Sequence, residues 1–196
     1  LSETSPVLSF NPASIKEFSG TTGVPLPSTD IKLLDDAGVE VALGQSGEVC
    51  AKGPQVMRGY WNQPEANAAA FTPDGYFKTG DVGVFDEQGF LKIVDRKKDM
   101  VLVSGFNVYP NEVEAVATAC PGVAECACVG VPDDKTGEAV KLFVVKAPGA
   151  TLTADEVIAH CRKEMTAYKV PKTVVFLDAL PKSTVGKILR RDLRSV

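Results

Sequence analysis

The sequence has few or none of the residue patterns that mark several common classes of protein. Its single histidine, His160, excludes a histidine-rich metal site. Its five cysteines form no CxxC pair, and the odd number leaves at least one thiol unpaired in any disulfide scheme. No apolar run approaches the roughly 20 residues that a membrane-spanning helix needs. A net charge of −4 argues against a nucleic-acid-binding protein.

These scarce residues are interpreted as structural. Cys126 and Cys128 are separated by one residue, so on a strand both side chains point to the same face. Free cysteines are among the most buried residues, which predicts reduced thiols in the core. His160 lies in a helical-looking segment, and no GxSxG motif supplies a nucleophile for it. The first residues lack the basic and apolar parts of a signal peptide, which predicts a cytoplasmic protein.

What the sequence does contain is an ordinary globular composition, with 44% hydrophobic and 23% charged residues. Its 196 residues suit two small domains. Residues 1–96 alternate apolar and polar side chains between turn signals, which predicts a small antiparallel β-barrel or sheet. An alanine-rich stretch, residues 63–75, predicts one short helix there.

Residues 97–196 show strand and helix patterns that alternate. Helices are predicted in 109–122 and 153–168, and strands in 99–105, 123–133, 139–147 and 173–180. The fold class is therefore α+β, with a compact second domain. The junction "DRKKD" is short and charged, without a Gly/Ser-rich linker, which predicts a hinge near Lys98.

Three stretches carry candidate chemistry. "YFKTGD" ends on Asp81, whose carboxylate follows a Thr-Gly turn and can accept hydrogen bonds from vicinal sugar hydroxyls. "DRKKDMVLVSGFNVYPNEVE" combines a cationic cluster, a glycine turn and a helix start. "PKSTVGKILRRDLR" places Lys187 after a flexible approach, where it can reach phosphate or carboxylate oxygens. Taken one at a time, these stretches are more typical of a common turn, a solvated junction and a cationic C-terminal helix than of a functional site.

Together and in this order, the motifs resemble the C-terminal part of the adenylate-forming enzymes, a family that includes acyl-CoA synthetases. "LSETSP" and "GEVCAKGPQVMRGYWNQPE" extend the resemblance over essentially the whole chain. The run "DGYFKTGDVGVFDEQGFLKIVDRKK" is most similar to fatty acyl-CoA synthetases, above all the bacterial long-chain-fatty-acid–CoA ligases. The resemblance implies that a fatty acid carboxylate attacks the α-phosphate of ATP, and that coenzyme A then displaces AMP.

The resemblance also implies roles for individual residues. Lys187 matches a mobile catalytic lysine that bridges phosphate and acyl oxygens in the first step. The remaining positions are Ser2 on the AMP phosphate, Glu3 on Mg²⁺, Asp81 and Arg96 on the ribose, Lys98 as the hinge, and Ser104, Gly105, Phe106 and Asn107 as a loop beside the CoA channel. Peripheral contact with the inner membrane and a homodimer are left open, as are chain-length preference and oligomeric state.

The segment "FSGTTGVPLPS", Phe18–Ser28, looks like a phosphate-binding loop but is expected not to be one. The family's phosphate loop resembles "SGTTGxPKG" and precedes the "TE" motif, here "SE". This segment follows that motif and has Leu26 in place of the lysine. We expect a turn that leads into the first strand of the barrel.

Two alternatives remain from the sequence. One is another acyl- or aryl-activating ligase, including one that transfers its acyl group to a carrier protein. The other is a non-catalytic module whose basic end, with Arg190, Arg191 and Arg194, meets a membrane or a partner. The chain starts inside the "GLSE"-type motif, so the phosphate loop and acyl tunnel are not in it, and these 196 residues alone are expected to be inactive.

Overall fold

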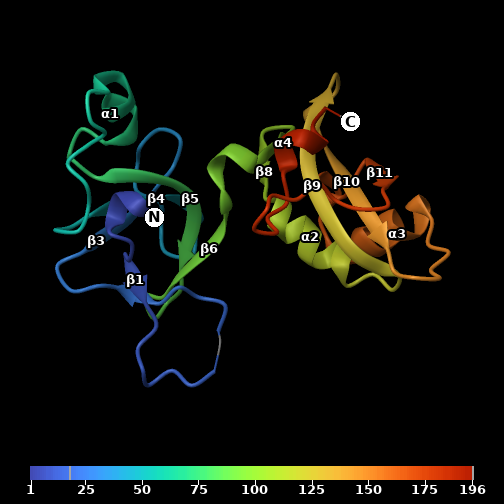
Figure 1. Cartoon of the computed structure of the whole chain (residues 1–196), viewed down its shortest axis with the longest axis horizontal. Coiled ribbons are helices and arrows are strands. Elements are labelled where there is room, and N and C mark those ends of the chain that lie inside the picture. Colours follow the sequence, from blue (N-terminus) through green and yellow to red (C-terminus); the bar gives the residue numbers. More distant parts are fainter. Residues whose placement is uncertain (18, 196) are drawn as a thin grey trace. The chain divides into compact units, whose positions relative to one another are not determined.

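A computed structural model describes residues 1–17 and 19–195, which form two units, Leu1–Lys98 and Asp99–Val196. Figure 1 labels most of their helices and strands. Among the described residues, no helix has both the length and the apolar character that crossing a membrane requires.

The first unit is built on a four-stranded antiparallel sheet in the order β3-β4-β5-β6. Its strands are β3 (Asp30–Leu34), β4 (Gly47–Lys52), β5 (Phe77–Phe85) and β6 (Leu91–Arg96). Alternation along β3 and β4 buries Ile31, Leu33, Val49 and Ala51 on one face, where they pack with Leu91. The predicted antiparallel sheet is confirmed, but over the described residues it stays open. The outer strands of this sheet, β3 and β6, do not pair with each other.

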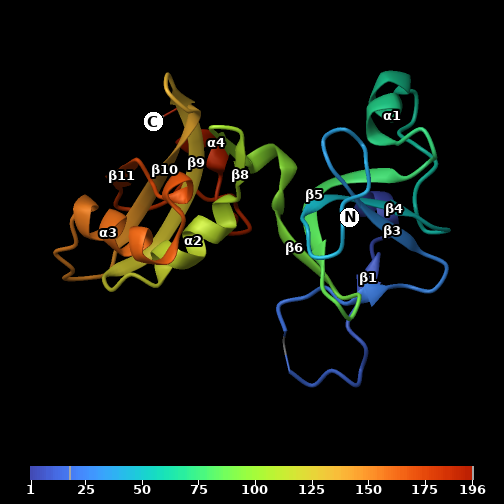
Figure 2. The same ribbon diagram turned by 180° about the vertical axis from the view of Figure 1, so that it is seen from behind.

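Short elements complete this unit. They are the 3₁₀ helix η1 (Ser2–Thr4), the paired strands β1 (Ser9–Phe10) and β2 (Val24–Pro25), and helix α1 (Pro64–Ala70) with its proline in the first turn. Figure 2 shows α1 beyond the end of the sheet.

In the segment that looked like a phosphate loop, Gly23 and strand β2 are β-structure, and the other described residues are loop, bend or turn; Phe18 lies outside the described residues. The Gly23 carbonyl accepts the Leu91 N–H at 2.8 Å, and the neighbouring Thr22 N–H donates to the Leu91 carbonyl at 2.7 Å. A Cβ at Gly23 would come within 2.0 Å of the Phe10 backbone, so this glycine is required by a close approach of two chains. The expected turn follows at Pro27 and Ser28, where the Thr29 N–H donates to the Leu26 carbonyl at 3.0 Å, and it leads into β3.

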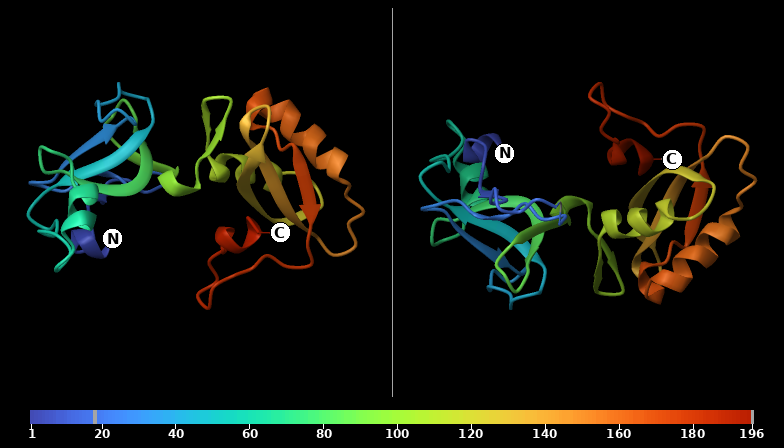
Figure 3. Two further views of the ribbon diagram at one scale, coloured as in Figure 1. Left: turned by 90° about the horizontal axis from the view of Figure 1, so that it is seen from above. Right: turned by 90° about the horizontal axis from the view of Figure 1, so that it is seen from below.

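The second unit is a five-stranded sheet with helices. Its strands are β7 (Val101–Val103), β8 (Phe106–Val108), β9 (Val123–Asp133), β10 (Gly137–Lys146) and β11 (Thr173–Phe176), in which only β10 and β11 pair in parallel. Helices α2 (Pro110–Thr118) and α3 (Ala154–Glu164) pack on one face. The short helix α4 (Arg190–Leu193) packs on the other. Figure 3 shows α3 and α4 on opposite sides of this sheet.

Strand β9 has a periodicity of two residues that separates these two faces. Cys126 and Cys128 face α2 and α3, whereas Ala127 and Val129 face the α4 side with Leu193. The prediction that both cysteines share one buried face is confirmed. All five thiols are free and buried, and burial raises the pKa of Cys50 and of Cys161 to about 11.

Candidate functional site

Asp81 and Arg96 are direct neighbours in the first unit. They are register partners on β5 and β6, and the Arg96 Nε lies 3.2 Å from the Asp81 Oδ1. The Asp81 side chain is 18% exposed and the Arg96 side chain 45%. The structure therefore gives the carboxylate a fixed orientation while leaving the pair open to a ligand.

The expected Thr-Gly turn before Asp81 is instead an irregularity inside β5. Glu48 pairs with Val82 and Cys50 with Lys78, so Val49 alone faces Thr79, Gly80 and Asp81. Gly80 has φ +71°, a left-handed conformation typical of a β-bulge. The sequence pattern did not reveal what holds the bulge in place. The Thr79 hydroxyl donates to the Val49 carbonyl at 2.8 Å and accepts from the Asp81 N–H at 3.1 Å.

Asp81 also borders a hollow of about 270 Å³. Thr4, Ser9, Thr22 and Thr79 contribute to its lining together with apolar side chains such as Leu91. The "SETSP" segment and the "KTGD" segment, about 75 residues apart in sequence, thus meet at one hollow. Of the predicted nucleotide residues, Asp81 lines it, Arg96 is joined to it through Asp81, and the exposed Ser2 does not line it.

Glu3 is held by Tyr60, a residue that the sequence did not single out. The Tyr60 hydroxyl donates to the Glu3 Oε1 at 3.1 Å, and the Met57 N–H donates to the Glu3 carbonyl at 2.8 Å. Burial and the hydrogen bond to Glu3 raise the pKa of the Tyr60 hydroxyl. Tyr60 therefore stays protonated near neutral pH and orients the Glu3 carboxylate.

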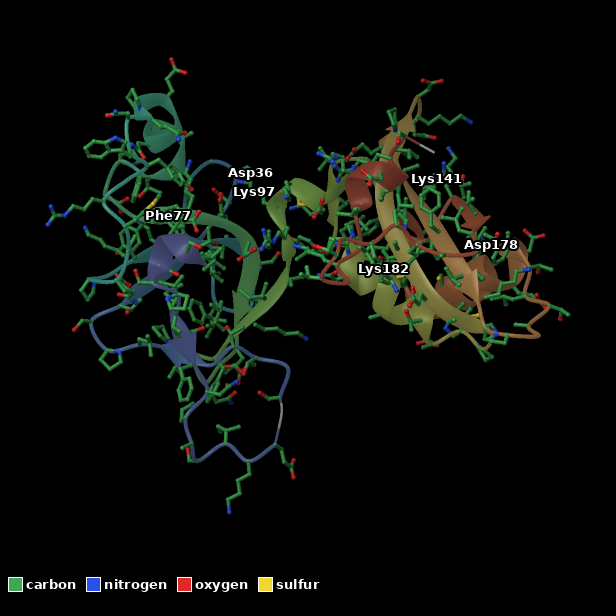
Figure 4. The ribbon with its side chains drawn as sticks, viewed as in Figure 1. Asp36, Phe77, Lys97, Lys141, Asp178 and Lys182 are labelled. Carbon is green, nitrogen blue, oxygen red and sulfur yellow. The ribbon has the colours of Figure 1, made fainter. Side chains whose placement is uncertain are left out.

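The junction residue Lys98 lies in the 3₁₀ helix η2 (Lys97–Asp99), at the end of the first unit. Its preceding neighbour, Lys97, binds Asp36 at 2.9 Å and Glu48 at 3.0 Å, both within that unit. Figure 4 shows Lys97 beside Asp36. Burial opposes the charge of Lys97, but the two carboxylates outweigh it and raise its pKa. Its following neighbour, Asp99, binds Arg194 within the second unit at 3.2 Å.

The predicted loop Ser104–Asn107 is a tight hairpin between β7 and β8. Ser104 and Gly105 have φ +51° and +84°, which suits the two-residue turn between strands with a right-handed twist. Phe106 and Asn107 are strand residues, and the Phe106 ring stacks on Tyr168 at 4.7 Å. A Cβ at Gly105 would meet no atom of the described chain within 4 Å, so the backbone angle is what requires glycine here. Ser104 also lines a hollow of about 490 Å³ with Arg162 and Tyr168.

Lys187 lies on an exposed hairpin of the second unit. The Ser183 carbonyl accepts from the Gly186 N–H at 2.9 Å, and the Ser183 N–H donates to the Lys187 carbonyl at 2.8 Å. The Lys187 N–H donates back to the Ser183 hydroxyl at 3.2 Å. The "flexible approach" of the sequence is therefore a closed turn in which Ser183, another residue not singled out from the sequence, fixes the backbone of Lys187.

The sequence of the chain is similar to those of known enzymes. The family model for AMP-binding enzymes matches residues 1–61, and that for the AMP-binding enzyme C-terminal domain matches residues 112–187. A long-chain-fatty-acid–CoA ligase of Salmonella typhimurium is 59% identical over 99% of the chain, and a feruloyl-CoA synthase of Amycolatopsis is 44% identical over 99%.

A solved structure gives the same result. The ATP-bound structure of MatB from Rhodopseudomonas palustris matches 98% of the chain with a TM-score of 0.91 and 39% identity, over 38% of its own length. The chain spans about a third of the Salmonella ligase, 34%, and 40% of the feruloyl-CoA synthase. It belongs to the AMP-binding, adenylate-forming enzyme family, and it corresponds to the C-terminal portion of that family's long-chain-fatty-acid–CoA ligases.

Proposed function

We propose that this chain is the C-terminal portion of an ATP-dependent long-chain-fatty-acid–CoA ligase. The observation that carries the proposal is the 59% identity over 99% of the chain to the Salmonella ligase, against 44% for the feruloyl-CoA synthase. The whole enzyme, meaning this chain with the part that corresponds to the rest of its relatives, would convert a fatty acid and ATP to acyl-adenylate and pyrophosphate. Coenzyme A would then take the acyl group and release AMP.

The chemistry needs a leaving group, because a free carboxylate is a poor electrophile. When the carboxylate oxygen attacks the α-phosphorus, the bond to the pyrophosphate oxygen breaks and AMP becomes that leaving group. The CoA thiol loses its proton and attacks the acyl carbon, and the bond to AMP breaks. Fixed positive groups lower the barrier where negative charge develops.

The described residues can share this work between the two units. In the first unit, the Asp81 carboxylate would accept hydrogen bonds from the ribose hydroxyls beside Arg96. In the second unit, the exposed Lys187 ammonium would contact phosphate and acyl oxygens during the first step. The Ser104–Asn107 hairpin, beside its hollow, would meet coenzyme A in the second step. Lys98 would be the hinge about which the second unit turns between the steps.

Glu3 and Ser2 would act on the phosphate side of the nucleotide. The described residues hold no group of three or more His, Cys, Asp or Glu side chains suited to a metal. Mg²⁺ is usually bound by one or two carboxylates together with substrate phosphates, so a single oriented Glu3 fits such an ion. The ion would neutralise charge on the phosphates of ATP.

The two alternatives from the sequence have less support. An aryl acid as substrate is favoured only by the lower identity to the feruloyl-CoA synthase. The alternative of a basic, membrane-binding surface is weakened, because two of its three arginines form ion pairs within the unit: Arg190 with Glu114 and Arg194 with Asp99. Only the third, Arg191, has a side chain that is 92% exposed. Peripheral membrane contact and a homodimer are not needed for the proposed reaction.

The test separates the two half-reactions in the whole enzyme. Lys187→Ala should lower fatty-acid-dependent ATP–pyrophosphate exchange by roughly 10²–10³-fold, the usual loss for one preorganised charge stabiliser. It should leave acyl-CoA formation from supplied acyl-adenylate within about threefold of the unmodified enzyme. Exchange that depends on an aryl acid and not on a fatty acid would overturn the substrate class. Equal loss of both half-reactions would overturn the role of Lys187.

A further inference from the structure

Helix α4 begins three residues after Lys187 and joins the Lys187 hairpin to the body of the second unit. The Leu189 N–H donates to the Pro181 carbonyl at 2.8 Å, and the backbones of Lys182 and Ile188 pair in an antiparallel β-bridge. The hairpin is therefore closed at its base. Leu193 is 1% exposed and belongs to the apolar cluster on the α4 side of the sheet. Ile188, which is partly buried, packs against that cluster. Because hairpin and helix form one continuous closed segment, the orientation of α4 sets the position of Lys187.

Arg190 fixes the start of this helix. Its Nη2 donates to both carboxylate oxygens of Glu114, at 2.9 and 2.8 Å, and to the Asn111 Oδ1 at 3.0 Å. The two charged side chains are 17% and 16% exposed, so solvent screens their attraction only partly. A charged pair at this depth is costly to desolvate and contributes most when its geometry is well defined.

Glu114 is itself held on a second side. Its Oε1 accepts the backbone N–H of Cys128 on β9 at 2.7 Å. The carboxylate therefore joins three elements: its own helix α2, strand β9 and, through Arg190, helix α4. Such a network orients Arg190 more strictly than an isolated surface pair would.

Arg194 fixes the other end of α4. Its Nη2 lies 3.2 Å from the Asp99 Oδ1, and the Asp99 side chain is 13% exposed. Asp99 is the first residue of the second unit and directly follows Lys98. One short helix thus connects the Lys187 hairpin to α2, to the sheet and to the residue after the junction.

We propose that Glu114 and Asp99 are positioning residues for Lys187, acting through Arg190 and Arg194. These two ion pairs, which we call the α4 clamp, make the hairpin move as one body with the start of the second unit. The proposal rests on the proposed role of Lys187 in adenylation. Neither carboxylate needs to touch a substrate.

The matched variants come from the same two helices. Glu114→Gln keeps the size of the side chain and an oxygen for the Cys128 N–H, but removes the charge that holds Arg190. Arg191→Gln changes the charge of α4 at an exposed position between the two clamp arginines. Glu112→Gln changes the same charge on α2, where the partner is Lys169 and not α4. Asp99→Asn tests the second arm separately.

In the whole enzyme, Glu114→Gln should lower ATP–pyrophosphate exchange at least tenfold and leave acyl-CoA formation from supplied acyl-adenylate within about threefold. Asp99→Asn should act in the same direction. The two controls, Arg191→Gln and Glu112→Gln, should keep the rates of both half-reactions within about twofold of those of the unmodified enzyme. In a Lys187→Ala background, Glu114→Gln should cause no further loss of exchange, because a positioning residue acts only through the group it positions.

The contrary results are distinct. If Glu114→Gln lowers both half-reactions equally together with the thermal midpoint, or still lowers exchange when Lys187 is absent, the pair is only structural and the proposal is wrong. If neither Glu114→Gln nor Asp99→Asn lowers exchange, it is also wrong. If Lys187→Ala itself leaves exchange intact, the proposed function of Lys187 fails first, and the clamp fails with it. Should Glu114→Gln not fold, Asp99→Asn decides by the same criteria.

Discussion

Asp81 and Arg96 face each other across β5 and β6 as register partners, with the Arg96 Nε 3.2 Å from the Asp81 Oδ1. Each comes from a different sequence motif, and only the antiparallel pairing of the two strands brings them together. The bulge at Gly80 turns Asp81 so that it also borders the hollow next to Thr4. A carboxylate held in this way is preorganised for a ligand with two adjacent hydroxyls.

Asp81→Asn should weaken binding of AMP to the whole enzyme about tenfold or more. The amide keeps the shape of the side chain, but it cannot accept two hydrogen bonds as an anion, and bonds to charged groups contribute roughly 1.5–3 kcal/mol. Isothermal titration with AMP measures the change. Glu87→Gln, an exposed residue in the turn of the same hairpin, is the matched control and should bind normally. Unchanged affinity in Asp81→Asn would contradict the proposed ribose contact.

Lys98→Pro should slow formation of acyl-CoA from supplied acyl-adenylate by tenfold or more, with a smaller effect on ATP–pyrophosphate exchange. Lys97 is tied to the first unit and Asp99 to the second, so rotation between the units would fall on the backbone of Lys98. Proline fixes φ near −65° and prevents that rotation. Single-turnover kinetics separate the two steps. Lys98→Ala, which keeps the backbone free, should slow neither step as strongly, and equal slowing by both variants would argue against a hinge.

The helices and strands of this fold could be predicted from sequence where the periodicity of apolar residues agreed with the Pro and Gly signals that begin and end an element. Pro110 at the first turn of α2 and the two-residue alternation around Cys126 and Cys128 are local signals, and both elements are found where the sequence placed them. The failure concerns backbone geometry. A turn is predicted at Thr79-Gly80, but the structure has a bulge inside β5, because Gly with a polar neighbour is typical of a turn and of a bulge alike. The glycine turn predicted between Asp95 and Glu114 is found at Ser104-Gly105.

The candidate site shows the same division. The chemical groups Asp81, Arg96 and Lys187 could be named from their motifs, since the residue type carries the chemistry. Their supports could not, because the partners lie far away in sequence. Tyr60 is 57 residues from Glu3, and Arg190 is 76 residues from Glu114. Arg190 and Arg194 looked like part of a basic surface patch because their partners, Glu114 and Asp99, are also far away in sequence.

Thr153→Ala should lower the stability of the second unit by about 1 kcal/mol, within a usual range of roughly 0.5–2. Thr153 begins α3 with a capping box, in which its hydroxyl accepts the Glu156 N–H at 3.3 Å and the Glu156 carboxylate accepts the Thr153 N–H at 2.8 Å. Urea denaturation of the chain measures the change. Thr151→Ala, an exposed threonine upstream of the helix, should change stability little, and Thr153→Ser should restore it. Equal effects of the two alanine variants would show that the cap contributes nothing.

The stability supplied by Asp133 should depend on pH. Lys172 and the Thr136 hydroxyl hold the pKa of the Asp133 carboxyl well below its usual range, and the N–H groups of Lys135 and Thr136 also donate to it at 3.1 Å. The carboxylate thus closes the turn between β9 and β10 and ties it to the residue before β11. Because the pKa is lower in the folded state than in the unfolded state, protons bind more readily to the unfolded chain.

The sign follows from that difference. The contribution of Asp133 is fully present above the unfolded pKa, about 3.9, and is lost as the pH falls from there through the depressed folded pKa. Asp133→Asn should therefore lower the urea midpoint clearly at pH 7, and the gap between the two proteins should narrow below about pH 4. Asp134→Asn, an exposed carboxylate in the same turn, is the control. A gap that stays constant from pH 7 to the acid limit would mean that Asp133 stabilises the turn through its shape and hydrogen bonds rather than through its charge.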